Sequence, residues 1–178
     1  PTVTYSITGG ADASSFAVTT DGVLTLTTAA DYESGKTSYE VTVTATDNDD
    51  TNSTPQTITV TIEDVNDNAP VFTMNTLLDI DENTTAVTTL TTTDADTNPT
   101  VSYSITGGPD AASFAVNEST GALTLITAAD HESGKILYEV IVSANDGVNS
   151  TDQGIRLSIN DVNDNAPVFT STATPSIA

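Results

Sequence analysis

Residues 63–72 read EDVNDNAPVF, and residues 160–169 read NDVNDNAPVF. Each stretch gathers acidic and amide side chains in its first half and changes to apolar residues at a proline. Asn and Asp favour turns, and Pro is tolerated at the first position of a strand. Each stretch therefore reads as a connection followed by the start of a strand. Because the same junction occurs twice, the chain is predicted to be built from repeated units.

The similarity extends well beyond the two junctions. PTVTYSITGGADASSFAV at 1–18 returns as PTVSYSITGGPDAASFAV at 99–116, and LTLTTAADYESGK at 24–36 returns as LTLITAADHESGK at 123–135. A repeat of about 100 residues is a whole domain, which predicts a tandem array. We expect an N-terminally truncated repeat with its linker at 1–68, a complete repeat with its linker at 69–165, and the first strand of a further repeat or a tail at 166–178.

Short segments that alternate between apolar and polar residues fill each copy. Examples are TVTYSIT, VLTLTT, SYEVTVTAT and QTITVTIE, all rich in Thr, Val, Ile and Tyr and separated by Gly, Asn, Asp or Ser. This period of two is typical of half-buried strands, and no long segment keeps a helical period. Several short strands per repeat without intervening helices predict an all-β fold made of antiparallel β-sandwiches.

The composition narrows the choice of partners. Among 178 residues, 25 acidic side chains face three basic ones, Lys36, Lys135 and Arg156, for a net charge of −22. Nucleic acid and an anionic membrane surface both require clustered Lys and Arg and are therefore disfavoured. Without cysteine the chain forms neither disulfides nor thiolate metal sites. No apolar run reaches the roughly 20 residues that cross a membrane, and any signal peptide would lie outside this sequence. The carboxylates must therefore be balanced either by water and sodium or, as a more specific choice, by divalent cations.

The spacing of the oxygen-bearing residues suits a cation. In an extended segment, residues i and i+2 point to the same side. A set made only of oxygen atoms favours hard cations, and flexible carboxylates with backbone carbonyls favour Ca²⁺ over Mg²⁺. The acidic and amide residues with this spacing are Asp64, Asn66 and Asn68 in the first junction, Asp31 and Glu33 in DYE, and Asp130 and Glu132 in DHE.

An EF-hand loop does not fit these junctions. DVNDN imitates the start of that loop, but Ala69 stands where the loop needs Gly and Asn75 stands where it needs Glu. The second copy differs in the same way, with Ala166 and Thr172. Both junctions also lie between predicted strands, whereas an EF-hand loop joins two helices.

Taken in order, the motifs resemble those of tandem cadherin repeats across nearly the whole chain. DxE occurs at 31–33 and 130–132, DxNDNAPxF at 64–72 and 161–169, and DAD at 94–96. An Asp follows a predicted strand at Asp47 and Asp146, and an acid, Glu82, lies in the first strand region. The resemblance implies Greek-key β-sandwiches with Ig-like architecture in a linear array, with three Ca²⁺ ions at each boundary. Tyr32 and His131 stand where the family usually has Arg, and both are expected to point away from the ions.

The resemblance also implies which residues bind the ions. Asp47 would serve a boundary before this sequence. At the first boundary the lowest ion has its full set (Asn66, Asn68, Asp94, Asp96 and Asp146), whereas an early Glu for the upper ions is missing. At the second boundary only the upper ions have ligands. The implied ligands are Asp31, Glu33, Asp64, Val65 (carbonyl), Asn66, Asp67, Asn68 (carbonyl), Asp94, Asp96, Asn98 (carbonyl) and Asp146 for the first boundary, and Glu82, Asp130, Glu132, Asp161 and Asp164 for the second.

We expect a non-catalytic, calcium-rigidified adhesion or spacer module of an extracellular or cell-surface protein. Like charges about 4 Å apart repel by ~4 kcal/mol at an effective dielectric near 20, so calcium should lock boundaries that otherwise splay. The composition favours a bacterial-type surface or secreted protein. The expected partners are calcium ions, other cadherin-like repeats or surface proteins, and a second copy bound through the edges of the truncated repeat. Adhesion by exchange of an anchoring Trp is not supported, because the chain has no Trp.

Two other functions fit the sequence less well. A calcium-dependent carbohydrate-binding module of a secreted polysaccharide-acting protein is the alternative, although the lack of Trp and the matching positions of the aromatic residues in both repeats count against it. A hydrolase using a pair such as Asp31 and Glu33 lacks a positioned base or a nucleophile elbow. His131 is expected to have no catalytic or ligand role. Asp12, Asp21, Asp49, Asp50, Asp110 and Asp152 are expected to be solvated loop acids.

Overall fold

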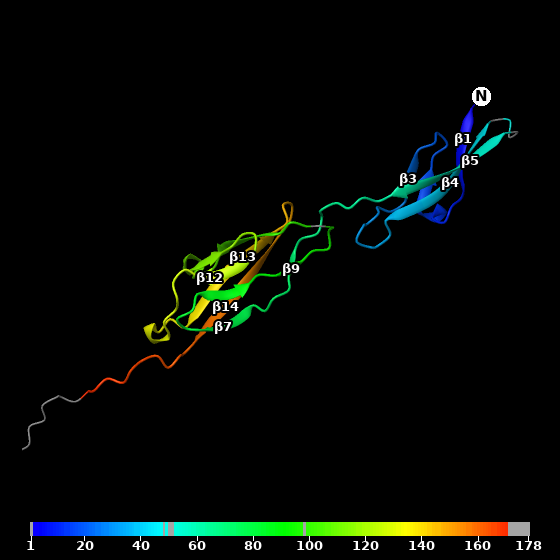
Figure 1. Cartoon of the computed structure of the whole chain (residues 1–178). Helices are drawn as coiled ribbons and strands as arrows, with labels where there is room; N and C mark the ends of the chain where they lie inside the picture. The colour runs from blue at the N-terminus through cyan, green and yellow to red at the C-terminus, as the bar shows by residue number, and fades with distance from the viewer. Residues whose placement is uncertain (1, 48, 50–51, 98, 171–178) are drawn as a thin grey trace, which may run out of the picture. The chain divides into compact units, whose positions relative to one another are not determined.

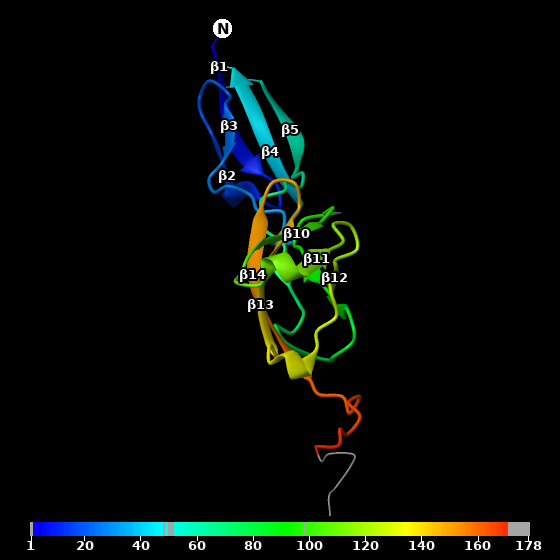
Figure 2. The ribbon, with the colours of Figure 1, turned by 90° about the vertical axis from the view of Figure 1, so that its left-hand side faces the viewer.

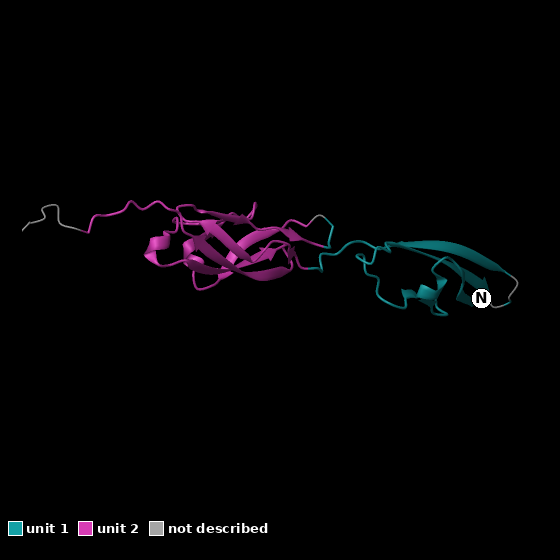
Figure 3. Ribbon diagram, turned by 90° about the horizontal axis from the view of Figure 1, so that it is seen from below, with its two compact units in different colours: residues 1–68, 95–98 teal, residues 69–94, 99–178 magenta. Residues whose placement is uncertain are grey.

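The computed structural model describes residues 2–47, 49, 52–97 and 99–170. The chain divides into two compact units, with unit 1 formed by residues 1–68 and 95–98 and unit 2 by residues 69–94 and 99–178 (Figure 3). Both units are built from β-strands, and the described residues contain three short 3₁₀ turns but no α-helix. No helix in the described part of the chain is long and apolar enough to cross a membrane.

Unit 1 consists of two small antiparallel sheets (Figure 1). The first has the order β1 (Val3–Gly9), β4 (Ser38–Asp47), β5 (Ser53–Thr61), and the second pairs β2 (Phe16–Val18) with β3 (Leu24–Leu26). A 3₁₀ turn, η1 (Ala13–Ser15), precedes β2. The apolar positions of the strands face inward, where Phe16, Val41 and Val43 form the buried core. The Phe16 ring also packs edge-on against Tyr39, with ring centroids 6.2 Å apart.

Unit 2 is a fuller sandwich (Figure 2). One sheet has the order β10 (Ser102–Gly107), β13 (Leu137–Asn145), β14 (Ser150–Asn160), β7 (Leu77–Asp81). The other contains β11 (Phe114–Val116), β12 (Ala122–Leu125) and β8 (Ala86–Thr89), and β6 (Val71–Phe72) pairs with β9 (Thr92–Thr93). The 3₁₀ turns are η2 (Ala111–Ser113) and η3 (His131–Ser133). The predicted all-β class with tandem sandwiches is confirmed. The sandwiches were predicted to be antiparallel, and one pair differs, since the edge strand β7 runs parallel to β14.

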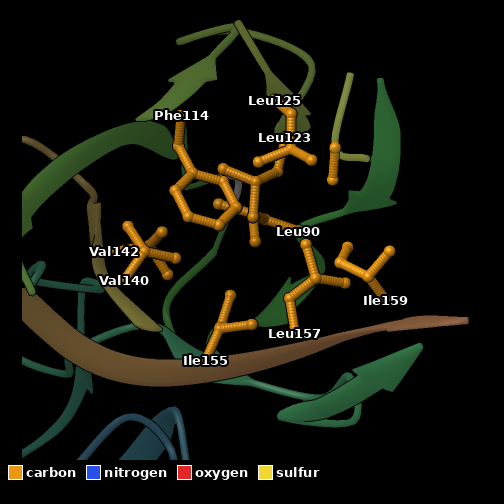
Figure 4. Close-up of a cluster of buried hydrophobic side chains, with 10 residues drawn as sticks. Leu90, Phe114, Leu123, Leu125, Val140, Val142, Ile155, Leu157 and Ile159 are labelled. Carbon is orange, nitrogen blue, oxygen red and sulfur yellow. The ribbon is translucent and has the colours of Figure 1, made fainter. Parts of the chain in front are cut away.

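The core of unit 2 lies between its four-stranded and its three-stranded sheet. Along β13 and β14 every second side chain points inward, as the period of two predicts, and meets side chains from β11 and β12 (Figure 4). Residues 69–94 add Leu90 to this core and pack Phe72, Leu78 and Val87 against it. The buried cluster comprises Leu90, Phe114, Leu123, Leu125, Ala129, Val140, Val142, Ile155, Leu157 and Ile159.

Asp12 and Asp110 are not solvated loop acids, which corrects the sequence-based expectation. In unit 2 Asp110 forms an ion pair with Lys135 and accepts a hydrogen bond from Glu139 N at 2.9 Å. The lysine ammonium lies 4.7 Å from the centre of the Tyr138 ring. Unit 1 repeats the arrangement around Asp12, with Lys36, Tyr39 and Glu40 in the same roles. Each acid therefore ties the loop before a 3₁₀ turn to the central strand of its sheet.

The remaining expectations about loops and tails are simpler. Asp21 and Asp49 are exposed as predicted. Asp152 is exposed too, but it lies within β14 and not in a loop, and Asp50 lies outside the described residues. Phe169 matches the recurring core aromatics in sequence, but its side chain is 95% exposed. Residues 166–170 form no strand, and the rest of the predicted strand, 171–178, lies outside the described residues.

Candidate metal centres

A tight turn in unit 1 positions the first two predicted ligands. Asp31 Oδ1 accepts a hydrogen bond from Ser34 N at 3.1 Å, and Ser34 Oγ donates back to the Asp31 carbonyl at 2.6 Å. Gly35 follows at φ 83°, a left-handed conformation that glycine adopts readily. The turn places Glu33 beside Asp31 in a hollow that Asp67 also lines. The DYESG sequence therefore builds an acidic surface from local hydrogen bonds alone.

The VNDN junction of unit 1 is held by residues 95–97 of the same unit. Asp64 Oδ2 accepts a hydrogen bond from Thr97 N at 2.6 Å. Asp96 is 6% exposed and accepts two bonds from Asn68, one from its backbone N at 3.1 Å and one from its side-chain amide at 2.9 Å. Single ligand atoms of Glu33, Asp67 and Asp96 lie within 4.8 Å of one another. The fold thus brings together three acids that are far apart in the sequence.

The electrostatics of this group favour a cation. Asp64 Oδ1 is buried, and no donor from the described residues forms a hydrogen bond with it. A hydrogen bond from its own backbone N–H lowers the pKa of Glu33. Desolvation and the carboxyl groups of Asp64, Asp31 and Asp67 outweigh that effect, so the pKa lies above its ordinary value. A positive ion among these oxygens would stabilise the charged form of each group.

Glu82 is the central residue of a second group, in unit 2. Its side chain is only 2% exposed, and its two oxygens accept hydrogen bonds from Val162 N at 2.8 Å and from His131 N at 2.7 Å. These two N–H donors lower the pKa of Glu82, although burial opposes them. Ligand atoms of Asp130 and Glu132 lie within 4.8 Å of it. A buried, ionised carboxylate is therefore fixed beside two other acids.

The neighbours of Glu82 are positioned by further polar contacts. Asp130 caps η3 by accepting a hydrogen bond from Ser133 N at 3.3 Å. Asp164 accepts one from the Asn83 amide at 2.6 Å, and Asn83 has a φ of 62°, which is uncommon for a residue other than Gly. For Glu132, a hydrogen bond from its own backbone N–H lowers the pKa. Burial and the nearby acids (Glu82, Asp164 and Asp161) outweigh it, and the pKa is raised.

His131 does not point away from this group, contrary to expectation. One of its ring nitrogens lies within 4.8 Å of ligand atoms of Glu132 and Asp161. The reason is that His131 begins the 3₁₀ turn whose backbone is bound by Glu82, so its side chain shares the end of unit 2 with the acids. The DHE sequence gave no signal for this position, because spacing by two assigns the middle residue to the opposite side.

A third pair of predicted ligands lies in unit 2 at Asp94 and Asp146. Asp146 is 8% exposed, and its Oδ1 accepts hydrogen bonds from Val148 N at 2.8 Å and Asn149 N at 2.7 Å. A carboxylate oxygen of half-buried Asp94 lies within 4.8 Å of one on Asp146. Two acids from distant parts of the repeat are thus brought together by the fold.

The other predicted ligands are less constrained. Val65 is 67% exposed, Asn66 is half-buried, and Asn98 lies outside the described residues. Asp47, which was predicted to serve a different boundary, accepts a hydrogen bond from the Asn52 amide at 3.2 Å. The sequence reasoning missed the residues that orient the acids, namely Ser34, Asn83, Thr97 and Ser133. For the two serines a signal existed, since each stands three residues after an Asp in a DxxS turn.

The donor chemistry of these groups fits calcium. Carboxylate oxygens form these groups, joined in one of them by a ring nitrogen of His131, and the chain has no cysteine to supply a thiolate. Such hard, flexible oxygen ligands are the ones that Ca²⁺ takes in proteins.

The fold and the acidic groups together define cadherin repeats. The cadherin domain profile matches residues 2–63 and 77–160, and the chain belongs to this family. Similar proteins include Protocadherin Fat 4 of Mus musculus, 42% identical over 72 residues, and Neural-cadherin of Drosophila melanogaster, 36% identical over 69 residues. Each match covers 39% of this chain, which corresponds to 1% and 2% of the lengths of those two proteins.

Solved structures of cadherin ectodomains resemble the whole chain. The protocadherin gammaB7 EC3-6 cis-dimer structure matches with a TM-score of 0.74 and 31% identity, over 97% of this chain and 44% of that one. The extracellular cadherin domains 3–6 of protocadherin gamma B2 match with a TM-score of 0.76 and 28% identity, over 98% of this chain and 45% of that one. The chain therefore spans less than half of either structure.

Proposed function

We propose that the chain is a calcium-binding, non-catalytic adhesion or spacer module of an extracellular or cell-surface protein. Membership of the cadherin family and the acidic groups of both units support the proposal. Its partners would be calcium ions and other cadherin repeats. The similar protocadherin gammaB7 structure is a cis-dimer, which is consistent with such partners.

The observation on which the proposal depends is Glu82 with its acidic neighbours. A carboxylate that is 2% exposed and lies beside Asp130 and Glu132 needs a positive partner, because unpaired buried charge is costly. The three basic residues of the chain are engaged elsewhere: Lys36 with Asp12, Lys135 with Asp110, and Arg156 with Glu139. The His131 ring beside Glu132 and Asp161 can supply at most one positive charge, so we propose that a cation that is not part of the protein balances the rest of this group.

The proposed ligands follow the groups described above. When bound, Ca²⁺ supplies the positive charge that offsets the carboxylates, and the chain's own contribution is to hold the oxygens in place through turns and backbone N–H donors. The ions are proposed to stiffen the VNDN segments that join consecutive repeats. The ligands in unit 2 are Glu82, Asp130, Glu132, Asp161, Asp164, Asp94 and Asp146, and those in unit 1 are Asp31, Glu33, Asp64, Val65, Asn66, Asp67, Asn68, Asp96 and Asn98.

Calorimetric titration with CaCl₂ tests the proposal. We expect uptake with dissociation constants of roughly 10⁻⁴–10⁻³ M, as in extracellular calcium modules, and a rise in melting temperature that EDTA reverses. Glu82→Gln should remove part of the uptake. Asp152→Asn also removes one negative charge, but from an exposed strand position, and should leave the uptake unchanged. Absence of measurable uptake by the unmodified chain would refute the proposed function.

A further inference from the structure

We propose that His131, Glu132 and Asp161 bind zinc at the end of unit 2, and that zinc competes there with calcium. Zinc binding itself does not depend on the proposed function, whereas the competition rests on it. The starting point is the only histidine of the chain. One of its ring nitrogens and one carboxylate oxygen each from Glu132 and Asp161 all lie within 4.8 Å of one another.

The ring nitrogen distinguishes these three residues from the other acidic groups of the described residues, which offer carboxylate oxygens alone. No hydrogen bond or ion pair within the described ranges uses the His131 ring, so its nitrogen is available to a metal. Imidazole nitrogen is a common ligand of Zn²⁺, whereas Ca²⁺ takes roughly six to eight oxygen atoms. A donor set of one nitrogen and two oxygens therefore fits zinc better than calcium.

Glu82 holds together the segments that carry these side chains. Its Oε2 accepts a hydrogen bond from His131 N at 2.7 Å, and its Oε1 accepts one from Val162 N at 2.8 Å. Val162 directly follows Asp161. In addition, Glu82 N donates to the Asn160 carbonyl at 3.1 Å. One buried residue therefore joins two distant segments of the repeat, so that the imidazole ring and the Asp161 carboxylate meet.

The charge of Glu82 points independently to a bound cation. The side chain is 2% exposed, and the N–H groups of Val162 and His131 lower its pKa although burial opposes them, so it is ionised inside the fold. Glu132 and Asp161 add two further negative charges at this end of the unit. All three basic residues of the chain pair with other acids. A protonated His131 offsets at most one of these charges, whereas a divalent ion offsets two.

The three side chains need only small movements to hold the ion. Zn²⁺ takes four ligands at roughly 2.0–2.2 Å in a tetrahedron, so its donor atoms lie roughly 3.4 Å apart. Starting from at most 4.8 Å, each donor has to move by less than about 1 Å, and water supplies the fourth ligand. Glu132 and Asp161 are exposed and His131 is half-buried, so rotation of the side chains suffices. The bonds to Glu82 survive, because they use backbone N–H groups.

Unit 1 lacks the nitrogen ligand. Tyr32 stands at the position of His131, and Glu33 and Asp64 stand at the positions of the two carboxylate ligands. Because the chain has no cysteine and no second histidine, unit 2 alone offers zinc an imidazole or thiolate ligand. Zinc binding by one repeat and not by the other is therefore a difference that a single residue creates.

Shared ligands connect zinc to the proposed function. Glu132 and Asp161 are also proposed calcium ligands, and their oxygens cannot surround both ions at once. Calcium at about 5 mM should therefore weaken the apparent zinc affinity roughly 6- to 50-fold, given calcium dissociation constants of roughly 10⁻⁴–10⁻³ M. In the opposite direction, zinc should reduce calcium uptake at this end of unit 2 and leave the ligands of unit 1 unaffected.

The measurement is a titration of the calcium-free, untagged chain with ZnCl₂, followed by two-dimensional NMR of the imidazole ring. Because the chain has one histidine, its ring signals belong to His131 without further assignment. We expect one ring nitrogen to shift and the change to saturate at one zinc ion per chain. Calorimetry on the same samples gives the dissociation constant, with and without calcium.

Two variants test the ligands, and a third is their control. His131→Tyr installs the residue of unit 1 and should weaken zinc binding at least about tenfold, the smaller end of the losses seen when metal sites are disturbed. Asp161→Asn should weaken it to a similar extent. Asp152→Asn removes the same charge about 30 Å away along β14, beyond the range of screened charge interactions, and should change the dissociation constant less than about twofold. Melting temperatures without metal check that each variant folds.

Several results would overturn the proposal. Absence of zinc uptake up to about 1 mM would do so, as would unchanged zinc binding by His131→Tyr, which would assign the ion to carboxylates alone. One zinc ion per two chains would place the ligands in different molecules. Calcium titration of the same samples separates the two proposals. Normal calcium uptake without zinc binding refutes the zinc site alone, whereas zinc binding at His131 without calcium uptake refutes the proposed function alone.

Discussion

Units 1 and 2 have nearly the same strand sequences but differ in how deeply they bury them. Phe16 and Phe114 are 7% and 4% exposed, so the two units agree there. Leu24 and Leu26 are only half-buried, whereas their equivalents Leu123 and Leu125 are 1% and 2% exposed. Unit 2 differs because residues 69–94 add Leu90 and strands β6 to β9 over these positions. Alternation in a strand therefore fixes which face a residue occupies, and the opposing layer fixes how far it is buried.

The largest expected effect comes from truncating an equivalent leucine in each unit. Leu125→Ala should destabilise unit 2 by about 2–5 kcal/mol, the range for a fully buried leucine. Leu26→Ala should cost unit 1 roughly 1–2 kcal/mol, because less apolar surface leaves water there. Native-state hydrogen exchange reads the amides of each unit separately. Equal losses in the two units would show that the difference in burial has no energetic consequence.

Calcium binding at the acidic groups of the two units offers a second comparison, in which each substitution should have a somewhat smaller energetic effect. Glu82→Gln should weaken calcium binding at its group in unit 2 by about tenfold (roughly 1.4 kcal/mol) and leave the ligands of unit 1 unaffected. Asp96→Ala should weaken calcium binding at the group that Asp96 forms with Glu33 and Asp67, and it should leave the Glu82 group unaffected. Two-dimensional NMR during a calcium titration distinguishes the groups, since each variant should remove shifts from one set of amides. Asp21→Asn, at an exposed loop, serves as the control. Loss of both sets in either variant would mean that the groups bind as one.

The contacts among Asp110, Lys135 and Tyr138 predict that the free energy of unfolding depends on pH. The hydrogen bond from Lys135, followed by the one from Glu139 N–H, lowers the pKa of Asp110 in the folded chain. A depressed folded pKa stabilises the protein above the unfolded value, about 3.9, and this stabilisation is lost as the pH falls through the folded pKa. Asp110→Asn should therefore cost about 1 kcal/mol at pH 7. Urea denaturation should show that the difference in the free energy of unfolding between the unmodified chain and Asp110→Asn disappears below pH 4. A difference that does not change with pH would contradict the assignment.

The smallest effect should come from transferring an exposed residue between the units. Thr42→Ile gives unit 1 the residue found at Ile141 and removes the hydroxyl that pairs with Thr57. Because the site is a half-exposed outer face, the stability of unit 1 should change by less than about 0.5 kcal/mol. Thermal unfolding measures this. A larger loss would indicate that the threonine pair, and not the inner core, supports that sheet.

Much of the fold was predictable from the sequence because it depends on local pattern. Val140, Val142, Ile155 and Leu157 are buried where the alternation of apolar residues placed them. The parallel pairing of β7 with β14 was not predictable, because it joins segments about 80 residues apart and depends on the closed sandwich. The internal repeat supplied the strongest signal, since it aligned the two copies without any other sequence.

The candidate site also has a part that the sequence predicts and a part that only the fold creates. Spacing by two identified Asp31, Glu33, Asp130 and Glu132, and the fold places these acids beside others, but whether they bind calcium stays a prediction. The two backbone donors to Glu82 arise from η3 and from residue 162, and no short motif encodes their meeting. The expectation for Asp110 was wrong for a related reason. Its lysine lies 25 residues away, and only the folded loop brings the pair together.

The scarcity of basic residues has a practical consequence. Trypsin cleaves after Lys and Arg, so this chain of 178 residues offers it three peptide bonds. Two of them follow Lys36 and Lys135, which occupy equivalent turns and are equally held by an Asp and a Tyr ring. Their cleavage rates in one digest therefore act as paired reporters of transient opening in the two repeats. Each unit therefore carries its own cleavage site for measuring how often that unit opens, and the two sites have the same residue and the same contacts.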